Sequence, residues 1–571
     1  MIIGNCSGFY GDRLAAMREQ LEGGDLDYLT GDYLAELTML ILGRDQLKDA
    51  SLGYARTFVR QLEDCLGLAL ERGVHIVSNA GGLNPAGLAD KVREVARGLG
   101  LDVAVVHVEG DDLRHRADEM GFDGALTANA YLGGAGIAAA LGAGADVVVT
   151  GRVTDASLVV GPAMAHHGWT PEQHDALAGA VVAGHVLECG AQATGGNFSG
   201  FLDLPESART APLGFPLAEV AADGSSVITK HDGTGGAVTV DTVTAQLLYE
   251  VQSTRYLGPD VTVDLTSVRL EQVGPDRVAI TGVRGQAPPE QLKVCVNELG
   301  GFRNQAELVL TGLRVEEKAA WVRDQVEAAL DPRPAEVAWS EVVAPPADAV
   351  TEEAASVLLR CTVKDPEAGP VGRPFTAAVV ELALASYPGF TVTAPPAAPT
   401  PYGIYRPAYV ARDRVEHTVV HADGRREVVA DPPTAGPVED RTGTRPSPYP
   451  HPSDRLTRRL PLGTFVHARS GDKGGDANLG LWVAHDDSAK YADRVEWLAK
   501  LITPQKIREL VPESRDLEVE VFLLPNLGGV NVLLRGLLGE GVAASTRFDP
   551  QAKGLGEWVR SRSVSIEDRL L

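Results

Sequence analysis

The fold is decided by the stretch ADVVVTGRVTDAS, residues 145–157. Val147–Val149 stand together without an intervening polar residue, which is typical of a strand in a parallel sheet that is buried on both faces. Gly151 allows the chain to turn after this strand, and Thr154 or Asp155 is expected to cap the helix that follows.

Two charged side chains in this stretch are candidates for chemistry. In an open α/β sheet, ligands bind beyond the carboxyl ends of the strands, which is where Arg152 and Asp155 are expected. Arg152 can clamp a carboxylate or a phosphate, and Asp155 can orient the arginine or move a proton. The alternative is an ordinary turn that carries a surface ion pair.

The same order of strand, glycine-rich loop and helix occurs several times along the chain. Repeated strand–helix alternation predicts right-handed βαβ crossovers and an α/β domain with a mostly parallel, doubly wound sheet. The predicted strands are 2–3, 74–78, 103–108 and 146–150, and the predicted helices are 14–22, 32–40, 57–72, 86–98 and 134–141.

Composition limits the class of protein. The 571 residues need more than one core, and a net charge of -25 argues against binding to nucleic acid or to an anionic membrane. The five cysteines are widely scattered, as in a reducing compartment, and no signal peptide or membrane-spanning stretch is visible. We therefore expect a soluble, cytoplasmic protein, and a homo-oligomer on general grounds.

Three regions are predicted. Residues 1–430 form the large α/β domain, and from about 261 to 430 β-rich segments and one long helix at 316–330 indicate an α+β portion. Residues 431–460 are rich in proline and indicate a linker. Residues 461–571 have the size and element order of a small α+β domain of ferredoxin-like type, with a glycine-rich charged loop at 469–478.

The first loop, residues 4–13, contains Ser7 and Asp12 before a helix, and backbone N–H groups there can hold an anion. Its Gly4-x-Cys6-x-Gly8 spacing also matches a nucleophile elbow, although that motif normally follows several strands. The loop after residue 78 supplies further candidates for binding substrate, Asn79, Gly81 and Gly82, as Gly151 does after residue 150.

Two pairs at helical spacing are candidates for chemistry. Asp32 and Glu36 are predicted on one face of a helix, as part of a site or of a solvated acidic surface. Cys189 stands one turn after His185, so a nucleophilic Cys–His pair is possible. A buried, inert cysteine is the alternative, since a helix C-terminus disfavours the thiolate.

The remaining candidates lie in other polar loops. Gly195, Gly196 and Asn197 suit close approach of the backbone to a ligand. His231, beside Asp232, is a candidate acid–base group or an ordinary loop histidine. In the last domain, mixed charge at Asp472 and Lys473 indicates more than a plain turn.

The sequence requires no cofactor. The P-loop pattern and the GxGxxG dinucleotide fingerprint are absent after the first strand, which disfavours an oxidoreductase, and no zinc spacing occurs. Carboxylates from several loops could bind Mg²⁺ without leaving a sequence signature.

Over essentially its whole length, the chain resembles the acyclic terpene utilisation (AtuA) family. The matching segments are Ser7-x-Phe9-x-Gly11-Asp12, residues 32–39, 53–55 and 78–85, Thr150-Gly151-Arg152-x-x-Asp155, His185-x-x-Glu188-Cys189, and, in the small C-terminal domain, residues 470–474 and 524–527.

The resemblance implies a role in the catabolism of acyclic terpenes and related branched acids, handled as acyl-CoA thioesters. It implies no particular mechanism. Beside it, the residues in the glycine-rich loops suit lyase, hydratase or thioester hydrolase chemistry on an acyl group. Together with the resemblance, they predict an enzyme that acts on a branched or hydroxylated acyl group. Its expected catalytic residues are Asp12, Arg152, Asp155, His231, Asp232 and Cys189. The alternative is a non-catalytic subunit that binds an acyl ligand or assembles with a partner.

Overall fold

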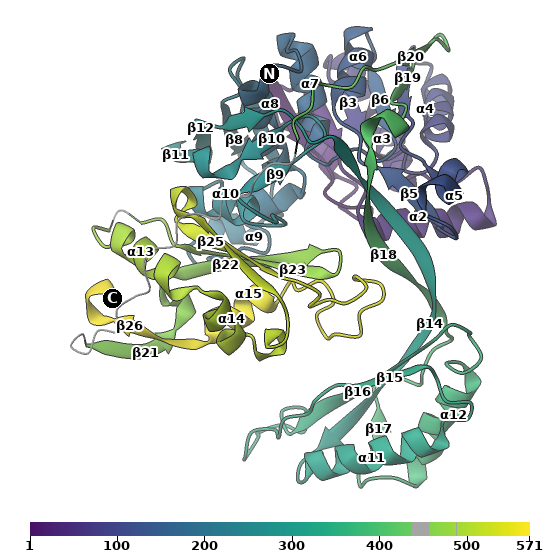
Figure 1. Ribbon diagram of the computed structural model, residues 1–571, viewed down its shortest axis with the longest axis vertical. Helices are drawn as coiled ribbons and strands as arrows, with labels where there is room; N and C mark the ends of the chain where they lie inside the picture. The colour runs from purple at the N-terminus through teal and green to yellow at the C-terminus, as the bar shows by residue number, and fades with distance from the viewer. Residues whose placement is uncertain (437–455, 487) are drawn as a thin grey trace. The chain divides into compact units, whose positions relative to one another are not determined.

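The computed structural model describes residues 1–436, 456–486 and 488–571 (Figure 1). They form two compact units. The first comprises Met1–Asn297, Tyr405–Val542 and Gln551–Leu571, and the second comprises Glu298–Ile404 and Ala543–Pro550. Most of the linker predicted at 431–460 lies outside the described residues.

The centre of the first unit is an 11-stranded sheet in the order β11-β12-β8-β7-β1-β2-β3-β6-β4-β19-β20. Its five middle strands are mutually parallel, which confirms the predicted doubly wound sheet, and the strands on either side are antiparallel. The parallel strands are β1 (Ile2–Asn5), β2 (Tyr28–Gly31), β3 (His75–Ser78), β6 (Val147–Thr150) and β4 (Val105–Glu109). The flanking strands are β7 (Pro216–Val220), β8 (Ser226–Lys230), β12 (Arg277–Thr281), β11 (Arg269–Gly274), β19 (Thr418–Val420) and β20 (Arg426–Val428).

Strand β6 is buried on both faces, as its three consecutive valines predict. Val147 and Val149 belong to one apolar core and Val148 to the other, because successive side chains of a strand point to opposite faces. The core of Val147 and Val149 includes helices α1 (Ala16–Gly23), α3 (Arg56–Glu71) and α4 (Pro85–Leu99), and that of Val148 includes α6 (Ala135–Gly142), α7 (Ser157–His167) and α8 (His174–Leu187).

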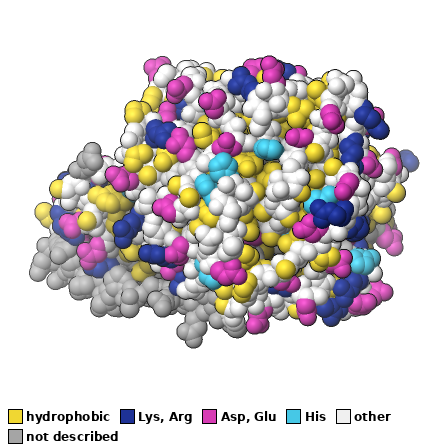
Figure 2. Space-filling model, turned by 90° about the horizontal axis from the view of Figure 1, so that it is seen from above, with side chains coloured by type: hydrophobic (Ala, Val, Ile, Leu, Met, Phe, Trp, Pro, Cys, Tyr) yellow, Lys and Arg dark blue, Asp and Glu magenta, His cyan; other side chains and the backbone are white. Residues whose placement is uncertain are grey.

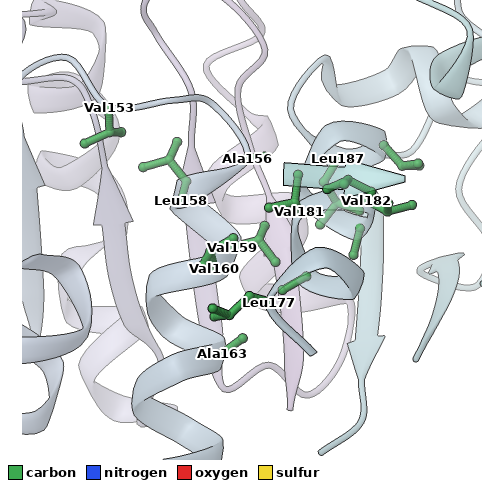
Figure 3. Close-up of a cluster of buried hydrophobic side chains, with 14 of the residues drawn as sticks. Val153, Ala156, Leu158, Val159, Val160, Ala163, Leu177, Val181, Val182 and Leu187 are labelled. Carbon is green, nitrogen blue, oxygen red and sulfur yellow. The ribbon is translucent and has the colours of Figure 1, made fainter. Parts of the chain in front are cut away.

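Helices α7 and α8 pack through purely apolar side chains. Figure 3 shows Val159 of α7 near Leu177 and Val181 of α8, and all three side chains are at most 4% exposed. Burying an aliphatic side chain of this size stabilises the fold by about 1.5–3 kcal/mol. The cluster therefore fixes the start of α7, directly after the polar stretch at 151–156.

Two helix starts differ from the sequence expectation. Helix α7 begins at Ser157 and its N-cap, Ala156, has no side-chain cap, because the Asp155 carboxylate is engaged by Arg152 instead. Helix α2 (Glu36–Lys48) begins four residues later than predicted, so Asp32 lies in the loop after β2. The expected helical pair of Asp32 and Glu36 is therefore wrong.

The C-terminal part of the first unit contains an antiparallel four-stranded sheet in the order β22-β23-β25-β24, as expected for a ferredoxin-like domain. Strands β22 (Val466–Lys473) and β23 (Asp476–Val483) run through most of the predicted loop at 469–478, leaving only Gly474 and Gly475 as the turn. The other elements are α13 (Tyr491–Leu501), α14 (Pro504–Leu510), β24 (Val519–Leu524), β25 (Gly529–Leu534), α15 (Leu555–Ser561), and β21 (Thr457–Pro461), which pairs with β26 (Ser563–Glu567).

The long strand β14 (Gln291–Thr311) belongs to both units. Its residues 294–297 lie in the first unit and pair there with β5 (Thr127–Ala130). Its later residues lie in the second unit and pair with β16 (Ser356–Asp365) and β17 (Thr391–Val392). Helices α11 (Val315–Ala329) and α12 (Arg373–Val380) pack on this sheet, which β15 (Glu336–Trp339) and β18 (Thr400–Ala411) complete.

The remaining elements of the first unit are short. They are α5 (Ala117–Met120), α9 (Glu206–Thr210), α10 (Val240–Leu247) and the three-stranded sheet of β13 (Arg284–Gln286), β10 (Thr262–Asp264) and β9 (Arg255–Leu257). Acidic and basic side chains are interspersed on the face shown in Figure 2. Within the described residues, no helix is both long and apolar enough to span a bilayer.

Candidate functional site

Three neighbouring parallel strands deliver polar residues to one edge of the large sheet. Asp32 follows β2, Asn79 follows β3, and Arg152 and Asp155 follow β6; these strands are adjacent in the order β2-β3-β6. Because parallel strands end at the same edge, loops far apart in sequence meet there, which is where ligands bind in this class of fold.

Arg152 is the centre of this cluster. Its side chain is 2% exposed, and Nη1 donates hydrogen bonds to the Leu34 carbonyl at 2.7 Å and to Asp155 Oδ1 at 2.8 Å. The guanidinium carbon lies 4.4 Å from the centroid of the Tyr131 ring, a cation–π distance. Nε is buried and has no hydrogen-bond partner among the described residues. The pair is therefore not an ordinary surface ion pair, because Arg152 is buried, while the Asp155 side chain is 24% exposed.

Asp111, which was not among the predicted site residues, fixes the backbone of Arg152. Its Oδ2 accepts hydrogen bonds from the Arg152 N–H at 2.8 Å and from Asn129 Nδ2 at 2.7 Å. A Cβ at Gly151 would lie only 2.2 Å from Asp111 Oδ1, so glycine is required at this position by close approach. Burial raises the pKa of Asp111 to about 7.

Asp32 and Asn79, which follow β2 and β3, form a hydrogen-bonded pair. Asn79 Nδ2 donates to Asp32 Oδ1 at 2.6 Å, while Asn79 Oδ1 accepts the Tyr33 N–H at 2.8 Å. Burial, and then the nearby Asp155 carboxylate, raise the pKa of Asp32 well above its ordinary value, although Arg152 acts against this. Asn79 therefore orients a carboxyl group that favours its protonated form.

Asp155 shares this electrostatic environment. Burial raises its pKa to about 6, with Arg152 lowering it and the Glu188 carboxylate raising it. Two interacting carboxyl groups beside one guanidinium titrate as a pair, so one of them can hold a proton while the other is ionised. This is the arrangement that general acid–base catalysis near neutral pH needs.

A second group of charges lies next to Arg152, around Glu36. Tyr131 Oη donates to Glu36 Oε1 at 2.8 Å, and Lys293 Nζ lies 3.6 Å from the same oxygen and 4.7 Å from the Tyr131 ring centroid. Burial would raise the pKa of Glu36, but Lys293 and Arg152 outweigh it and hold the pKa at about 2. Burial lowers the pKa of Lys293, and Glu36 opposes that shift.

The C-terminal domain contributes the end of strand β22, next to the turn of the β22–β23 hairpin. Lys473 Nζ lies 3.6 Å from Glu250 Oε2, and the Glu250 N–H donates to Asn478 Oδ1 at 2.7 Å. Burial and then the Glu250 carboxylate raise the pKa of Asp472 to about 7. Lys473 acts electrostatically on Glu36 and Asp155, so the hairpin belongs to the same charged interior.

His185 pairs with Glu188 rather than with Cys189. His185 Nδ1 lies 3.0 Å from Glu188 Oε1, and both side chains are buried. Burial lowers the pKa of His185, but the Glu188 carboxylate outweighs it and the pKa is raised. Burial, followed by Glu188 and Glu250, raises the pKa of Cys189 far above that of an ordinary thiol. A reactive thiolate is disfavoured in this environment.

Four other predicted site residues make local contacts. Ser7 Oγ donates to the Phe9 carbonyl at 3.0 Å, and Asp12 Oδ2 accepts the Gly8 N–H at 2.8 Å, so both close their own loop. His231 Nε2 lies 2.9 Å from the Gln20 carbonyl oxygen of α1, and Asp232 is exposed. None of the contacts described for these residues leads to Arg152 or Asp155.

The predicted glycines mostly serve close packing. A Cβ at Gly81 would lie 2.4 Å from the Thr150 carbonyl oxygen, and one at Gly82, whose φ is +53°, would lie 2.8 Å from the Gly53 carbonyl oxygen. Gly195 has a φ of +116°, and the carbonyls of Gly196 and Asn197 accept hydrogen bonds from a buried arginine of β22.

Replacing Gly81 by alanine is expected to lower the free energy of unfolding by about 1–3 kcal/mol, because the methyl group meets rigid backbone of Thr150 and Pro85. The control is Gly98→Ala in α4, where no neighbouring group of the described residues comes within 4 Å. That variant is expected to gain about 0.5–1 kcal/mol from helix propensity. Chemical denaturation measures whether the free energy of unfolding falls for Gly81→Ala and rises for Gly98→Ala. Equal changes in the two variants would contradict the close approach at Gly81.

The described residues hold no group of three His, Cys, Asp or Glu side chains placed to bind a metal ion. What they place together is one arginine, two lysines and carboxyl groups with opposed pKa shifts. Such a set can bind an anionic or carbonyl oxygen and move protons beside it.

The fold and site define a class of protein, a doubly wound α/β protein with an interior charged centre and an added ferredoxin-like domain. Comparison with family models identifies it further. The model described as acyclic terpene utilisation family protein AtuA matches residues 1–421, and the AtuA ferredoxin-like domain matches residues 460–565. The chain therefore belongs to the AtuA family. No curated protein and no solved structure matches it.

Proposed function

We propose that this protein is an enzyme that acts on a branched or hydroxylated acyl group, presented as an acyl-CoA or a related thioester, by lyase or hydratase chemistry. The observation that carries the proposal is the pair of buried Arg152 and partly buried Asp155 beside Asp32, with the pKa of both carboxyl groups raised. Membership of the AtuA family supports acyl substrates as the class to test.

The proposed chemistry needs two proton-transfer groups and one donor to an oxygen. In dehydration, a base removes the proton from the α-carbon and an acid protonates the departing β-hydroxyl group. In retro-aldol cleavage, a base takes the proton of the β-hydroxyl group, the Cα–Cβ bond breaks, and an acid protonates the resulting enolate. Asp155 and Asp32 supply the acid–base pair, and the unpartnered Nε of Arg152 supplies a donor to the acyl oxygen.

Hydrolysis through a covalent acyl intermediate has less support. Burial raises the pKa of Cys189, and the Ser7 hydroxyl donates to a backbone carbonyl rather than to a histidine or another base. The proposal also takes the protein to be cytoplasmic, because all five cysteines are free, and homo-oligomeric.

A turnover screen of the full-length protein tests this proposal. Branched-chain and β-hydroxyacyl-CoA thioesters and the corresponding free acids are incubated with the wild type, and products are identified by mass spectrometry. Loss of water, or cleavage to two shorter carbonyl products, is the expected outcome. Release of free CoA with an otherwise unchanged acyl chain would instead establish a hydrolase. Stabilisation by a CoA ester without any conversion would favour a binding subunit.

A further inference from the structure

A second buried arginine, Arg469, is far from the Arg152 loop in sequence. It lies in β22 of the ferredoxin-like domain and is 4% exposed. Its Nη1 donates hydrogen bonds to the carbonyl oxygens of Gly196 at 3.1 Å and Asn197 at 2.9 Å. One end of the guanidinium is therefore fixed by the glycine-rich stretch of the large domain.

The other edge of the same guanidinium has no protein partner. Nε and Nη2 of Arg469 are both buried, and neither has a hydrogen-bond partner among the described residues. A buried polar donor without a partner destabilises a protein, and more so when it is charged. The Nε–Nη2 edge presents two parallel N–H groups, which is the geometry that binds two oxygens of a carboxylate or a phosphate.

A second cation contacts the same tyrosine ring as Arg469. The Arg469 guanidinium carbon lies 4.7 Å and Lys553 Nζ 4.6 Å from the centroid of the same Tyr249 ring, and Lys553 also hydrogen-bonds to Tyr249 Oη. The nearby Glu250 carboxylate is engaged by Lys473 at 3.6 Å. Two cations on one aromatic ring, with one guanidinium edge that has no hydrogen-bond partner among the described residues, favour an anion.

We propose that Arg469 and Lys553, held on Tyr249 by the contact between the two domains, form an oxyanion-binding subsite for a carboxylate or phosphate group. The subsite goes beyond the function proposed above and involves neither Arg152 nor Asp155. It binds the two-oxygen face of the ligand through Nε and Nη2 of Arg469, and Lys553 adds the second charge.

Thermal unfolding of the full-length protein tests this subsite without any need for turnover. Inorganic phosphate and sodium acetate are titrated separately at constant ionic strength, so that the two arms distinguish a phosphate from a carboxylate ligand. The expected result is a saturable rise of the wild-type unfolding midpoint, by about 2 °C or more, in at least one arm. Arg469→Lys is expected to abolish the saturable rise, because lysine can still donate to the Gly196 and Asn197 carbonyls but lacks the two-donor edge.

The matched control is Arg284→Lys, which changes an exposed arginine paired with Asp175 at 2.5 Å and is expected to respond as the wild type does. Lys553→Gln is a second variant and is expected to weaken the response while leaving some of it. The proposal is overturned if the wild type shows only a gradual, unsaturable salt effect in both arms. It is equally overturned if Arg469→Lys keeps the wild-type response.

Discussion

Arg152→Ala is expected to lower the free energy of unfolding by about 3–5 kcal/mol at pH 8 and by clearly less at pH 5. The variant leaves buried Asp32 and partly buried Asp155 without the cation that now offsets their charge, and removing one partner of a buried pair costs about that amount. It also leaves the Leu34 carbonyl without its donor at 2.7 Å.

The sign of the pH dependence follows from the direction of the pKa shifts. Both carboxyl groups have raised pKa values in the folded protein, so the folded state binds more protons than the unfolded state above pH 4. Their penalty on stability is therefore small at low pH and grows as the pH rises through the folded pKa, which is about 6 for Asp155. Arg152 lowers both pKa values, so its removal extends the penalty to higher pH.

Chemical denaturation at the two pH values measures this effect. The matched control is Arg93→Ala, because Arg93 pairs with Asp90 at the same 2.8 Å and the same i,i+3 spacing, but with Asp90 80% exposed. We expect that control to change stability by less than about 1 kcal/mol at either pH. An equal loss for Arg152→Ala at pH 5 and pH 8 would show that packing, not charge, explains the role of Arg152.

Asp155→Asn is expected to reduce turnover by about 10²-fold or more on any substrate that the wild type converts. Asparagine has almost the same shape and can still accept the hydrogen bond from Arg152, but it cannot exchange a proton. The wild-type rate is expected to change with pH around 6, where Asp155 titrates, and the variant is expected to lack that change.

The control for Asp155→Asn is Asp90→Asn. This substitution removes the exposed carboxylate that pairs with Arg93, and the variant is expected to convert substrate at the wild-type rate. Circular dichroism and the unfolding midpoint establish that both variants fold. If Asp155→Asn keeps wild-type turnover and the wild-type pH profile, Asp155 takes no part in proton transfer, and the acid–base role moves to another carboxyl group.

The parallel core of the fold could be predicted because its elements are local in sequence. Val147–Val149 are apolar without interruption, and the helix predicted at 57–72 matches α3 to within a residue at each end. Strand β2, at Tyr28–Gly31, was missed because its four residues carry only a short apolar pattern. Asp32 was consequently placed in a helix, although it lies in the loop that the missed strand delivers to the site.

The candidate site was only partly predictable, since its contacts join distant segments. Arg152 and Asp155 are close in sequence, and their loop could be recognised after a buried strand. The sequence alone could not identify Asp111, Glu250 and Lys293. Asp111 and Lys293 contact partners that are 41 or more residues away in sequence. Glu250 pairs with a lysine of the ferredoxin-like domain. Of the three, only Asp111 has a signal in the sequence, because it stands two residues after the end of β4.

The central claim is that the buried centre at Arg152 moves protons on an acyl chain, and deuterium incorporation tests it most directly. The wild type, Asp155→Asn and Asp90→Asn are incubated in D₂O with the substrate found in the turnover screen, and the acyl chain is examined by mass spectrometry. For retro-aldol cleavage we expect deuterium at the α-carbon of the acyl product. For dehydration we expect it at the α-carbon of the β-hydroxyacyl compound that the reverse reaction, hydration, forms from the product. In either case incorporation is expected with the wild type and with Asp90→Asn, and is expected to be far slower with Asp155→Asn. Conversion by the wild type with no deuterium at the α-carbon, in the direction in which that carbon gains a hydrogen, would contradict the account.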